Sequence, residues 1–290
     1  MSSSSFKQLY LAGGMNERRR KSSLSVACAN DLESTQDSSQ QQTPWKLGIE
    51  RIDEFLPSFG LSQSGLHEIA PLKTSDMPCL TGFVFGLLSR LQTDKPIIWC
   101  ITASQIGDYG HPYAFGLSRF AVSPAQIIFA KVTKDKSLPF AMEEALKTDG
   151  VGAVIGEGPR PCFTGSRRLS LLCKTHQTPC LSMTTDSHAS NGSSALTRWQ
   201  VAPQHGVEDP RDPYGPGLPT WAVALPRVRY GRTMPALDDQ NVTQNKKTNY
   251  PWRIVWDDQT LSFSEASVFS SRALFESSAP NREPPKALVG

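Results

Sequence analysis

The sequence predicts an α/β protein whose mainly parallel sheet is flanked by helices and extended by antiparallel strands toward its C-terminal end. Two observations predict this class. Between about residues 65 and 185, short apolar runs alternate with helical patterns, which is the order of consecutive βαβ units. Beyond residue 190, strand-like runs follow one another with no helical pattern between them, so we expect these strands to pair antiparallel.

The strand-like runs are short, apolar and bounded by turn residues. In chain order they occupy residues 65–70, 95–103, 126–131, 151–157, 179–185, 198–203, 220–231 and 252–264, the last as a hairpin turning at Asp257-Asp258-Gln259. The expected helices occupy residues 49–56, 79–91, 112–120, 138–150 and 164–176. Gly82 and Gly86 lie four residues apart, and this spacing predicts close packing of the second helix against the sheet.

One domain accounts for most of the chain. The 290 residues, of which 38% are hydrophobic, supply enough apolar material for one sizeable core. Residues 1–43 are rich in Ser, Gln and charge and lack a sustained apolar period, so we expect a disordered N-terminal tail. The core domain is expected at 44–276, and the Pro-rich residues 277–290 are expected to form a flexible C-terminal tail.

Composition argues against several classes of protein. The six cysteines form no CxxC pair in a chain that is not small, so neither a disulfide framework nor a zinc ribbon is expected. The five histidines show no metal-ligand spacing, and we expect no metal site. No apolar run approaches the ~18 residues that a membrane-spanning helix needs, and the N-terminus lacks the apolar segment of a signal peptide. We therefore expect a cytoplasmic protein.

The stretch LHEIAPLKTSDMPCLTGFVFGLLSRL has the outline of a strand, a tight loop and a helix, and it resembles the nucleotide-binding P-loop region of RecA-like proteins. A working loop, GxxxxGK[ST], cradles phosphates with its backbone N–H groups and its lysine. Laid on that pattern, Pro71 and Asp76 replace the glycines, Met77 replaces the lysine and Pro78 replaces the Ser/Thr. Lys73 is the loop's remaining cation. The resemblance therefore implies a degenerate P-loop.

Two further RecA-like positions lack their catalytic residues. The run VGAVIGE resembles the strand of the second nucleotide motif, and it places Gly156 where an acid assists Mg²⁺, with Glu157 one residue later. A displacement by one residue in a strand points the side chain to the opposite face. In the run IIWCITASQ, Ser104 occupies the place of the water-activating glutamate. We therefore expect a RecA-like fold that is not an enzyme, with no catalytic residue and no cofactor.

Several phrases together resemble the ImuA family over roughly residues 45–264: WKLGIERIDEFLPSFGLSQSGLHEIA, PYAFGL, VSPAQII, AMEEAL, GVGAVIGE, TGSRRLSLL, TRWQVAP and WRIVWDDQTLSFS. Proteins of this family are RecA-like accessory factors of a bacterial damage-inducible mutagenesis cassette. The resemblance implies an adaptor in translesion DNA synthesis under the SOS response. The implied partners are ImuB, which is a Y-family-like polymerase homologue, and an error-prone polymerase of the DNA polymerase III alpha type.

Basic residues suggest a contact with single-stranded DNA or with a partner protein. The candidates are Arg167, Arg168, Arg227, Arg229 and Arg232. Alternate strand residues share a face, so Arg227 and Arg229 are expected to lie together and could track phosphates. A solvated sheet face explains the same pattern equally well.

Two other functions stay open at this point. A divergent ATPase would use Lys73 and Glu157 in place of the missing residues. A distant similarity of the family to SulA implies, alternatively, an SOS inhibitor that sequesters a cell-division protein.

Overall fold

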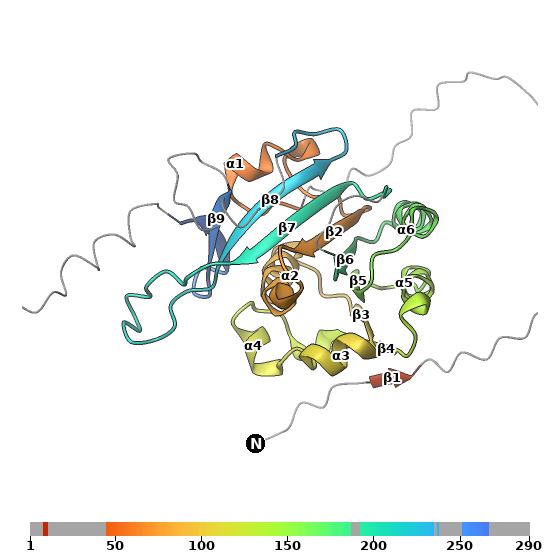
Figure 1. Ribbon diagram of the computed structural model, residues 1–290, viewed down its shortest axis with the longest axis horizontal. Coiled ribbons are helices and arrows are strands. Elements are labelled where there is room, and N and C mark those ends of the chain that lie inside the picture. Colours follow the sequence, from red (N-terminus) through yellow and green to blue (C-terminus); the bar gives the residue numbers. More distant parts are fainter. Residues whose placement is uncertain (1–7, 11–44, 187–191, 235–236, 238–250, 267–290) are drawn as a thin grey trace, which may run out of the picture.

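The computed structural model describes residues 8–10, 45–186, 192–234, 237 and 251–266, which form a single ten-stranded sheet with helices on both faces (Figure 1). The strands are β1 (Gln8–Tyr10), β2 (Leu66–Pro71), β3 (Ile97–Thr102), β4 (Ile127–Val132), β5 (Ala153–Gly158), β6 (Cys180–Thr184), β7 (Thr197–Pro203), β8 (Thr220–Val228), β9 (Trp252–Asp257) and β10 (Ser262–Glu265). Their order across the sheet is β1-β4-β3-β5-β6-β2-β7-β8-β9-β10.

The strand pairing confirms the predicted fold class. Every pair from β1 to β7 in this order is parallel, whereas β8, β9 and β10 are added antiparallel. The parallel strands are connected through helices, as such strands require. The β2 strand lies near the middle of the sheet and is buried along its whole length, which is typical of a parallel strand covered on both faces.

Six α-helices are described, and the three longest pack against the parallel strands. The helices are α1 (Glu50–Asp53), α2 (Met77–Leu91), α3 (Ala103–Tyr109), α4 (Ala114–Ser118), α5 (Leu138–Leu146) and α6 (Phe163–His176). Side chains of α2, α3 and α4 share one apolar core with the sheet, and α5 and α6 share a second core on the other face. Figure 1 shows α2, α3 and α4 on one side of the parallel strands and α5 and α6 on the other. No helix in the described ranges is long and apolar enough to cross a bilayer.

The two glycines of α2 face aromatic side chains of the antiparallel strands. A Cβ atom at Gly82 would lie 3.2 Å from the ring of Trp221 in β8, and a Cβ atom at Gly86 would overlap the ring of Phe263 in β10. The predicted close packing of this helix against the sheet is therefore confirmed, and its two glycines face β8 and β10.

Two elements were not expected from the sequence. The α3 helix follows β3 directly, and the short β1 strand pairs in parallel with β4 within the segment expected to be a tail. Within the segment expected to be a disordered tail, residues 1–43, the structure describes only this three-residue strand, and the expectation of a tail stays a prediction. The remaining positions of both expected tails lie outside the described residues.

Candidate functional site

In the loop after β2, the carboxylate of Asp76 accepts a hydrogen bond from the loop's own backbone. Thr74–Asp76 form a single turn of 3₁₀ helix between β2 and α2. The backbone N–H of Lys73 donates to Asp76 Oδ2 at 3.0 Å, and the hydroxyl of Ser75 donates to Asp76 Oδ1 at 3.4 Å. In a phosphate-binding loop such donors are left for the ligand. Asp76 instead takes up one backbone donor and places a negative charge where an anion would have to sit.

The neighbouring positions also differ from those of a phosphate-binding loop. The side chain of Met77 is 1% exposed and belongs to the core beneath α2, so the position of the lysine faces away from solvent. Pro78 has no N–H to offer in the first turn of the helix. Pro71 is the last residue of β2 and pairs with Val201 of β7. Lys73 is exposed on the loop surface.

The α3 helix lies against this loop. The hydroxyl of Tyr109 donates to the carbonyl oxygen of Thr74 at 2.9 Å, which links the end of α3 to the turn before α2. At the other end of α3, Thr102 caps the helix by accepting from the N–H of Gln105 at 3.5 Å. Ser104 donates its hydroxyl to Asp135 Oδ1 at 2.8 Å. The serine at the position of the water-activating glutamate is therefore engaged within the protein.

Gly156 and Glu157 face opposite sides of β5. Gly156 faces α5, where the side chain of Met142 fills the space that a Cβ atom would need. Glu157 faces the α2 side, is 5% exposed and accepts a hydrogen bond from the indole N–H of Trp99 at 2.8 Å. Burial raises the pKa of this carboxyl group to about 7, although the bond from Trp99 acts in the opposite direction. Glu157 is therefore a core residue that is readily protonated near neutral pH.

A second buried titratable group lies in β2. The Nδ1 atom of His67 lies 2.8 Å from the Thr197 hydroxyl, and its Nε2 atom lies 2.9 Å from the carbonyl oxygen of Ser62. Because a carbonyl can only accept, Nε2 carries the proton and Nδ1 accepts from Thr197, which in turn accepts from the Trp199 indole at 2.9 Å. Burial lowers the pKa of His67 to about 4, so the neutral ring is the form that this chain of hydrogen bonds holds.

Glu68, beside His67, is the centre of a buried ion-pair network that the sequence did not reveal. Its carboxylate lies 2.8 Å from Nε of Arg198 and 3.9 Å from Nε of Arg160, and it accepts a hydrogen bond from the Ser193 hydroxyl. The carboxylate is fully buried, and both guanidinium groups are nearly so. The pair of Glu68 with Arg198 links β2 to β7. Removal of the Glu68 carboxylate would leave the two buried guanidinium groups without their counter-charge.

The candidate DNA-contact arginines fall into two separate groups. Arg167 is exposed on α6, and Arg168 on the same helix forms an ion pair with Glu143 of α5. The second group is at the end of β8. α6 packs on β2, and β7 lies between β2 and β8 in the sheet, so the two groups stand on separate elements.

The second group is Arg227, Arg229 and Arg232, and its first two members do not share one face of a strand as expected. Arg227 lies in β8 opposite Arg198, but β8 ends at Val228, so Arg229 lies in the following turn. The pKa of Arg227 is lowered by partial burial first and then by the charges of Arg198 and Arg229. The predicted strand over 220–231 is therefore too long by three residues, since the backbone of Tyr230 adopts a positive φ of 67° that ends the strand. Arg232 is exposed, and its N–H donates to the carbonyl of Phe55 at 3.1 Å.

Among the residues that the structure describes, no group of three or more His, Cys, Asp or Glu side chains could hold a metal ion. The cysteines in those ranges are all free thiols.

Comparison with known proteins identifies relatives of one kind. No family model matches the chain. Two curated relatives, both called Protein ImuA and from two strains of Caulobacter vibrioides (NA1000 / CB15N and ATCC 19089 / CIP 103742 / CB 15), are 29% identical to it over 198 residues. Each alignment covers 64% of this chain and 78% of the relative. The resemblance noted from the sequence is thus confirmed.

Proposed function

Because the chain is similar to two proteins of the ImuA family, we propose that it is a non-catalytic accessory protein of damage-induced mutagenesis and that it acts as an adaptor in translesion DNA synthesis. In this proposal it works in the bacterial cytoplasm on SOS induction. It joins an ImuB-like protein of the Y family to an error-prone polymerase of the DNA polymerase III alpha type, with a contact to single-stranded DNA as a further element.

The hydrogen bond of Asp76 to the loop backbone is the observation that carries the non-catalytic part of the proposal. A carboxylate already holds the N–H of Lys73, and the next position, Met77, is buried in the core. An incoming triphosphate would have to displace this carboxylate and would then find no cation in the position of the lysine. Glu157 lies in the core against Trp99, and this position supports the proposal that it holds no Mg²⁺.

The divergent ATPase is the competing function, and it needs Lys73 and Glu157. A chromosomal deletion complemented with Lys73→Ala or with Glu157→Gln separates the two proposals. We expect both variants to restore damage-induced mutation frequency to the wild-type level, because neither side chain has a catalytic task in an adaptor. Loss of complementation by Lys73→Ala, at wild-type protein abundance, would favour the ATPase.

Two cell experiments distinguish the adaptor proposal from the SulA-like alternative. In damaged cells, an adaptor is recovered with the ImuB-like protein and the polymerase, and its overproduction leaves cell length unchanged. Filamentation on overproduction, with no recovery of either polymerase protein, would favour the division inhibitor.

A further inference from the structure

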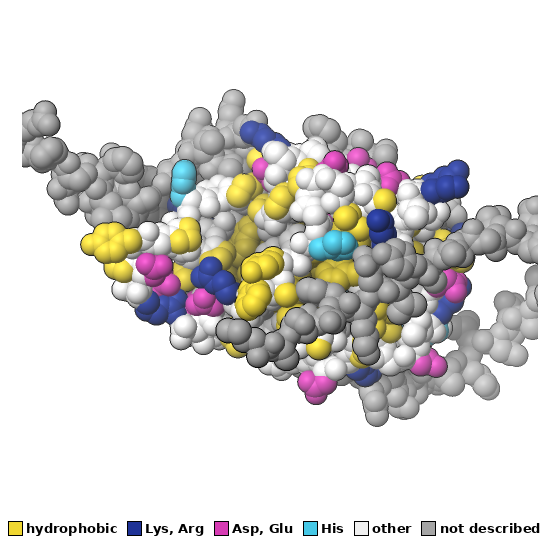
Figure 2. Space-filling view, turned by 90° about the horizontal axis from the view of Figure 1, so that it is seen from below, with side chains coloured by type: hydrophobic (Ala, Val, Ile, Leu, Met, Phe, Trp, Pro, Cys, Tyr) yellow, Lys and Arg dark blue, Asp and Glu magenta, His cyan; other side chains and the backbone are white. Residues whose placement is uncertain are grey.

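Three large aromatic side chains project from one side of the molecule. Tyr113 and Phe115, at the start of α4, are 72% and 74% exposed, and their rings lie against each other with centroids 5.4 Å apart. Tyr214, between β7 and β8, is 100% exposed. Figure 2 looks onto the side that carries α3 and α4, and it shows hydrophobic side chains gathered near the centre and at the far left, with charged side chains between them. Exposed aromatic residues of this size are typical anchors of protein interfaces.

Tyr214 stands on a structured arm, which we define as residues 204–219. The base of the arm is closed by hydrogen bonds from Gln204 N–H to Thr220 O at 3.0 Å and from Leu218 N–H to Val207 O at 2.7 Å. Near the tip, Asp209 pairs with Asp212 in an isolated bridge. In Figure 1 the arm extends well beyond the sheet at the left of the view. Its tip residue is thus presented to solvent by a backbone that is already folded.

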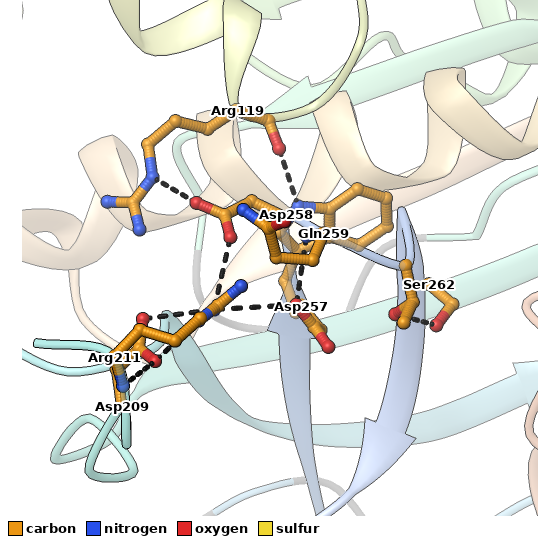
Figure 3. Close-up of polar contacts among 9 residues, drawn as sticks. Arg119, Asp209, Arg211, Asp257, Asp258, Gln259 and Ser262 are labelled. Atoms are coloured by element: carbon orange, nitrogen blue, oxygen red, sulfur yellow. Dashed lines mark hydrogen bonds and ion pairs between the residues drawn. The ribbon is translucent and has the colours of Figure 1, made fainter.

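An ion-pair joint ties the arm to the body of the protein (Figure 3). Arg211 Nε lies 2.7 Å from Asp209 within the arm, and Arg211 Nη2 lies 3.3 Å from Asp258 in the turn between β9 and β10. The hydrogen bonds from Arg211 lower the pKa of the Asp209 carboxyl group. The same Asp258 lies 3.0 Å from Nε of Arg119. One carboxylate therefore links the arm to α4.

The body side of the joint is held by a buried tryptophan. Arg119 directly follows α4, and its carbonyl oxygen accepts from the indole N–H of Trp256 at 2.9 Å. The Trp256 side chain is fully buried; its ring lies tilted to Phe120 and edge-to-face to Phe263, with ring centroids 5.2 and 5.0 Å apart. The buried indole therefore holds the backbone of Arg119, the residue that follows α4 and shares Asp258 with the arm. A backbone that is already folded in the free protein loses little conformational freedom on binding.

The charge around these anchors selects the kind of partner. Acidic side chains outnumber basic ones in the arm and the joint: Glu208, Asp209, Asp212, Asp257 and Asp258 stand against Arg119 and Arg211. Arg211 is the only Lys or Arg in the arm. A nucleic acid, whose binding depends on neutralising phosphates with cations, would be repelled here. A protein surface with apolar pockets and a basic rim is complementary to it.

We propose that the arm and the adjoining α4 form a protein-docking surface, with Tyr214 and the Tyr113–Phe115 pair as its anchors. The occupant is a partner protein that offers apolar pockets within a basic rim. The inference rests on the proposed function, because it takes the ImuB-like protein as this partner.

Binding of purified ImuB-like protein to the full chain, measured by surface plasmon resonance, tests the inference. We expect Tyr214→Ala to raise the Kd by about 30-fold or more, which is the effect of losing an interface hot spot. We expect the double variant Tyr113→Ala/Phe115→Ala to raise it by a similar factor. Tyr214→Phe is expected to retain most of the affinity, because it keeps the ring. Asp258→Asn, which removes the charge shared by Arg119 and Arg211, is expected to weaken binding less than Tyr214→Ala.

Tyr230→Ala is the matched control. Tyr230 is 88% exposed and follows the opposite end of β8, so its loss is expected to leave the Kd unchanged. The removed anchors are all exposed, and equal thermal melts of the variants verify the fold. If the wild type binds and both anchor variants bind equally well, the inference is wrong and the proposed function stands. If the wild-type chain fails to bind the ImuB-like protein, the proposed function fails, and the inference fails with it. If the anchor variants instead lose affinity for a dT oligonucleotide, the surface binds nucleic acid and the inference is overturned.

Discussion

Replacement of Glu157 by glutamine is expected to stabilise the protein at alkaline pH and to leave its stability unchanged in acid. Burial raises the pKa of this carboxyl group from 4.5 to about 7, so folding favours the protonated form. Between these two values the folded protein binds more protons than the unfolded chain, and its free energy of unfolding therefore falls as the pH rises. A glutamine is neutral at every pH, and its amide oxygen can still accept the bond from Trp99.

The size of the effect follows from the two pKa values. A difference of about 2.5 between the folded pKa and the ordinary value of 4.5, at ~1.36 kcal/mol for each pH unit, amounts to about 3 kcal/mol. This full difference between Glu157→Gln and the wild type is expected above pH 7. It should shrink through the window from pH 7 to 4.5 and vanish below it.

His67 has the opposite dependence on pH. Burial lowers its pKa from 6.5 to about 4, so its contribution to stability is complete above pH 6.5 and is lost as the pH falls toward 4. In the wild type the contributions of His67 and Glu157 nearly offset each other between pH 4.5 and 6.5. In Glu157→Gln the contribution of His67 is no longer offset by Glu157, and it is expected to raise the free energy of unfolding by about 3 kcal/mol from pH 4 to 6.5.

Urea unfolding followed by tryptophan fluorescence, repeated from pH 4 to 8.5, measures both effects. Glu144→Gln is the control, because Glu144 is a half-exposed carboxylate on α5 paired with Lys147, and such pairs contribute less than about 1 kcal/mol. A Glu157→Gln variant that is less stable than the wild type at pH 8, or equally displaced from it at pH 4.5 and 8, would refute the reasoning.

Three further changes test the packing and the surface. Gly86→Ala is expected to lower the free energy of unfolding in urea by about 1–3 kcal/mol, because its Cβ atom would overlap the Phe263 ring. Gly107→Ala in α3 is the control, since a Cβ atom there meets no neighbouring atom within 4 Å. An equal effect of both changes would count against this packing. Truncation after residue 250 is expected to abolish the cooperative thermal melt, because it removes the buried side chains of Trp252, Ile254, Trp256 and Phe263. Deletion of residues 1–43 should leave that melt in place. A cooperative melt of the 1–250 fragment would show that the hairpin is peripheral. Replacing Arg227, Arg229 and Arg232 by alanine is expected to flatten the salt dependence of single-stranded DNA binding by about 0.7 in log–log slope for each phosphate that is no longer neutralised, and an unchanged slope would assign these arginines to solvent or to a protein interface.

The parallel sheet could be predicted from the sequence, because short apolar runs bounded by turn residues indicate buried strands and helical patterns lie between them. The orientation of Glu157 relative to Gly156 followed from the two-residue period of a strand. By contrast, α3 has no apolar stripe, and it is held by the Thr102 cap and by the bond from Tyr109 to Thr74. Such an element is set by interactions with distant residues, which a local pattern does not record.

The polar interactions of the candidate surfaces were also beyond the sequence. Asp76 could be recognised as adverse to phosphate binding, but its bond to the backbone of Lys73 required the geometry of the turn. Arg119 and Asp258 are 139 residues apart in the chain, and only the closing of the β9–β10 hairpin against α4 brings them together. From the sequence the arm resembles an ordinary loop insertion, because its bridges involve few residues and it shows no alternation of apolar residues.

Calorimetric titration of the full chain with Mg-ATP tests the central claim most directly, namely that this is a RecA-like fold serving as an adaptor and not as an ATPase. The carboxylate of Asp76 on the loop backbone and the buried Met77 predict no saturable heat at millimolar nucleotide. Micromolar binding of Mg-ATP that is abolished by Lys73→Ala would contradict the account and would establish a divergent nucleotide site.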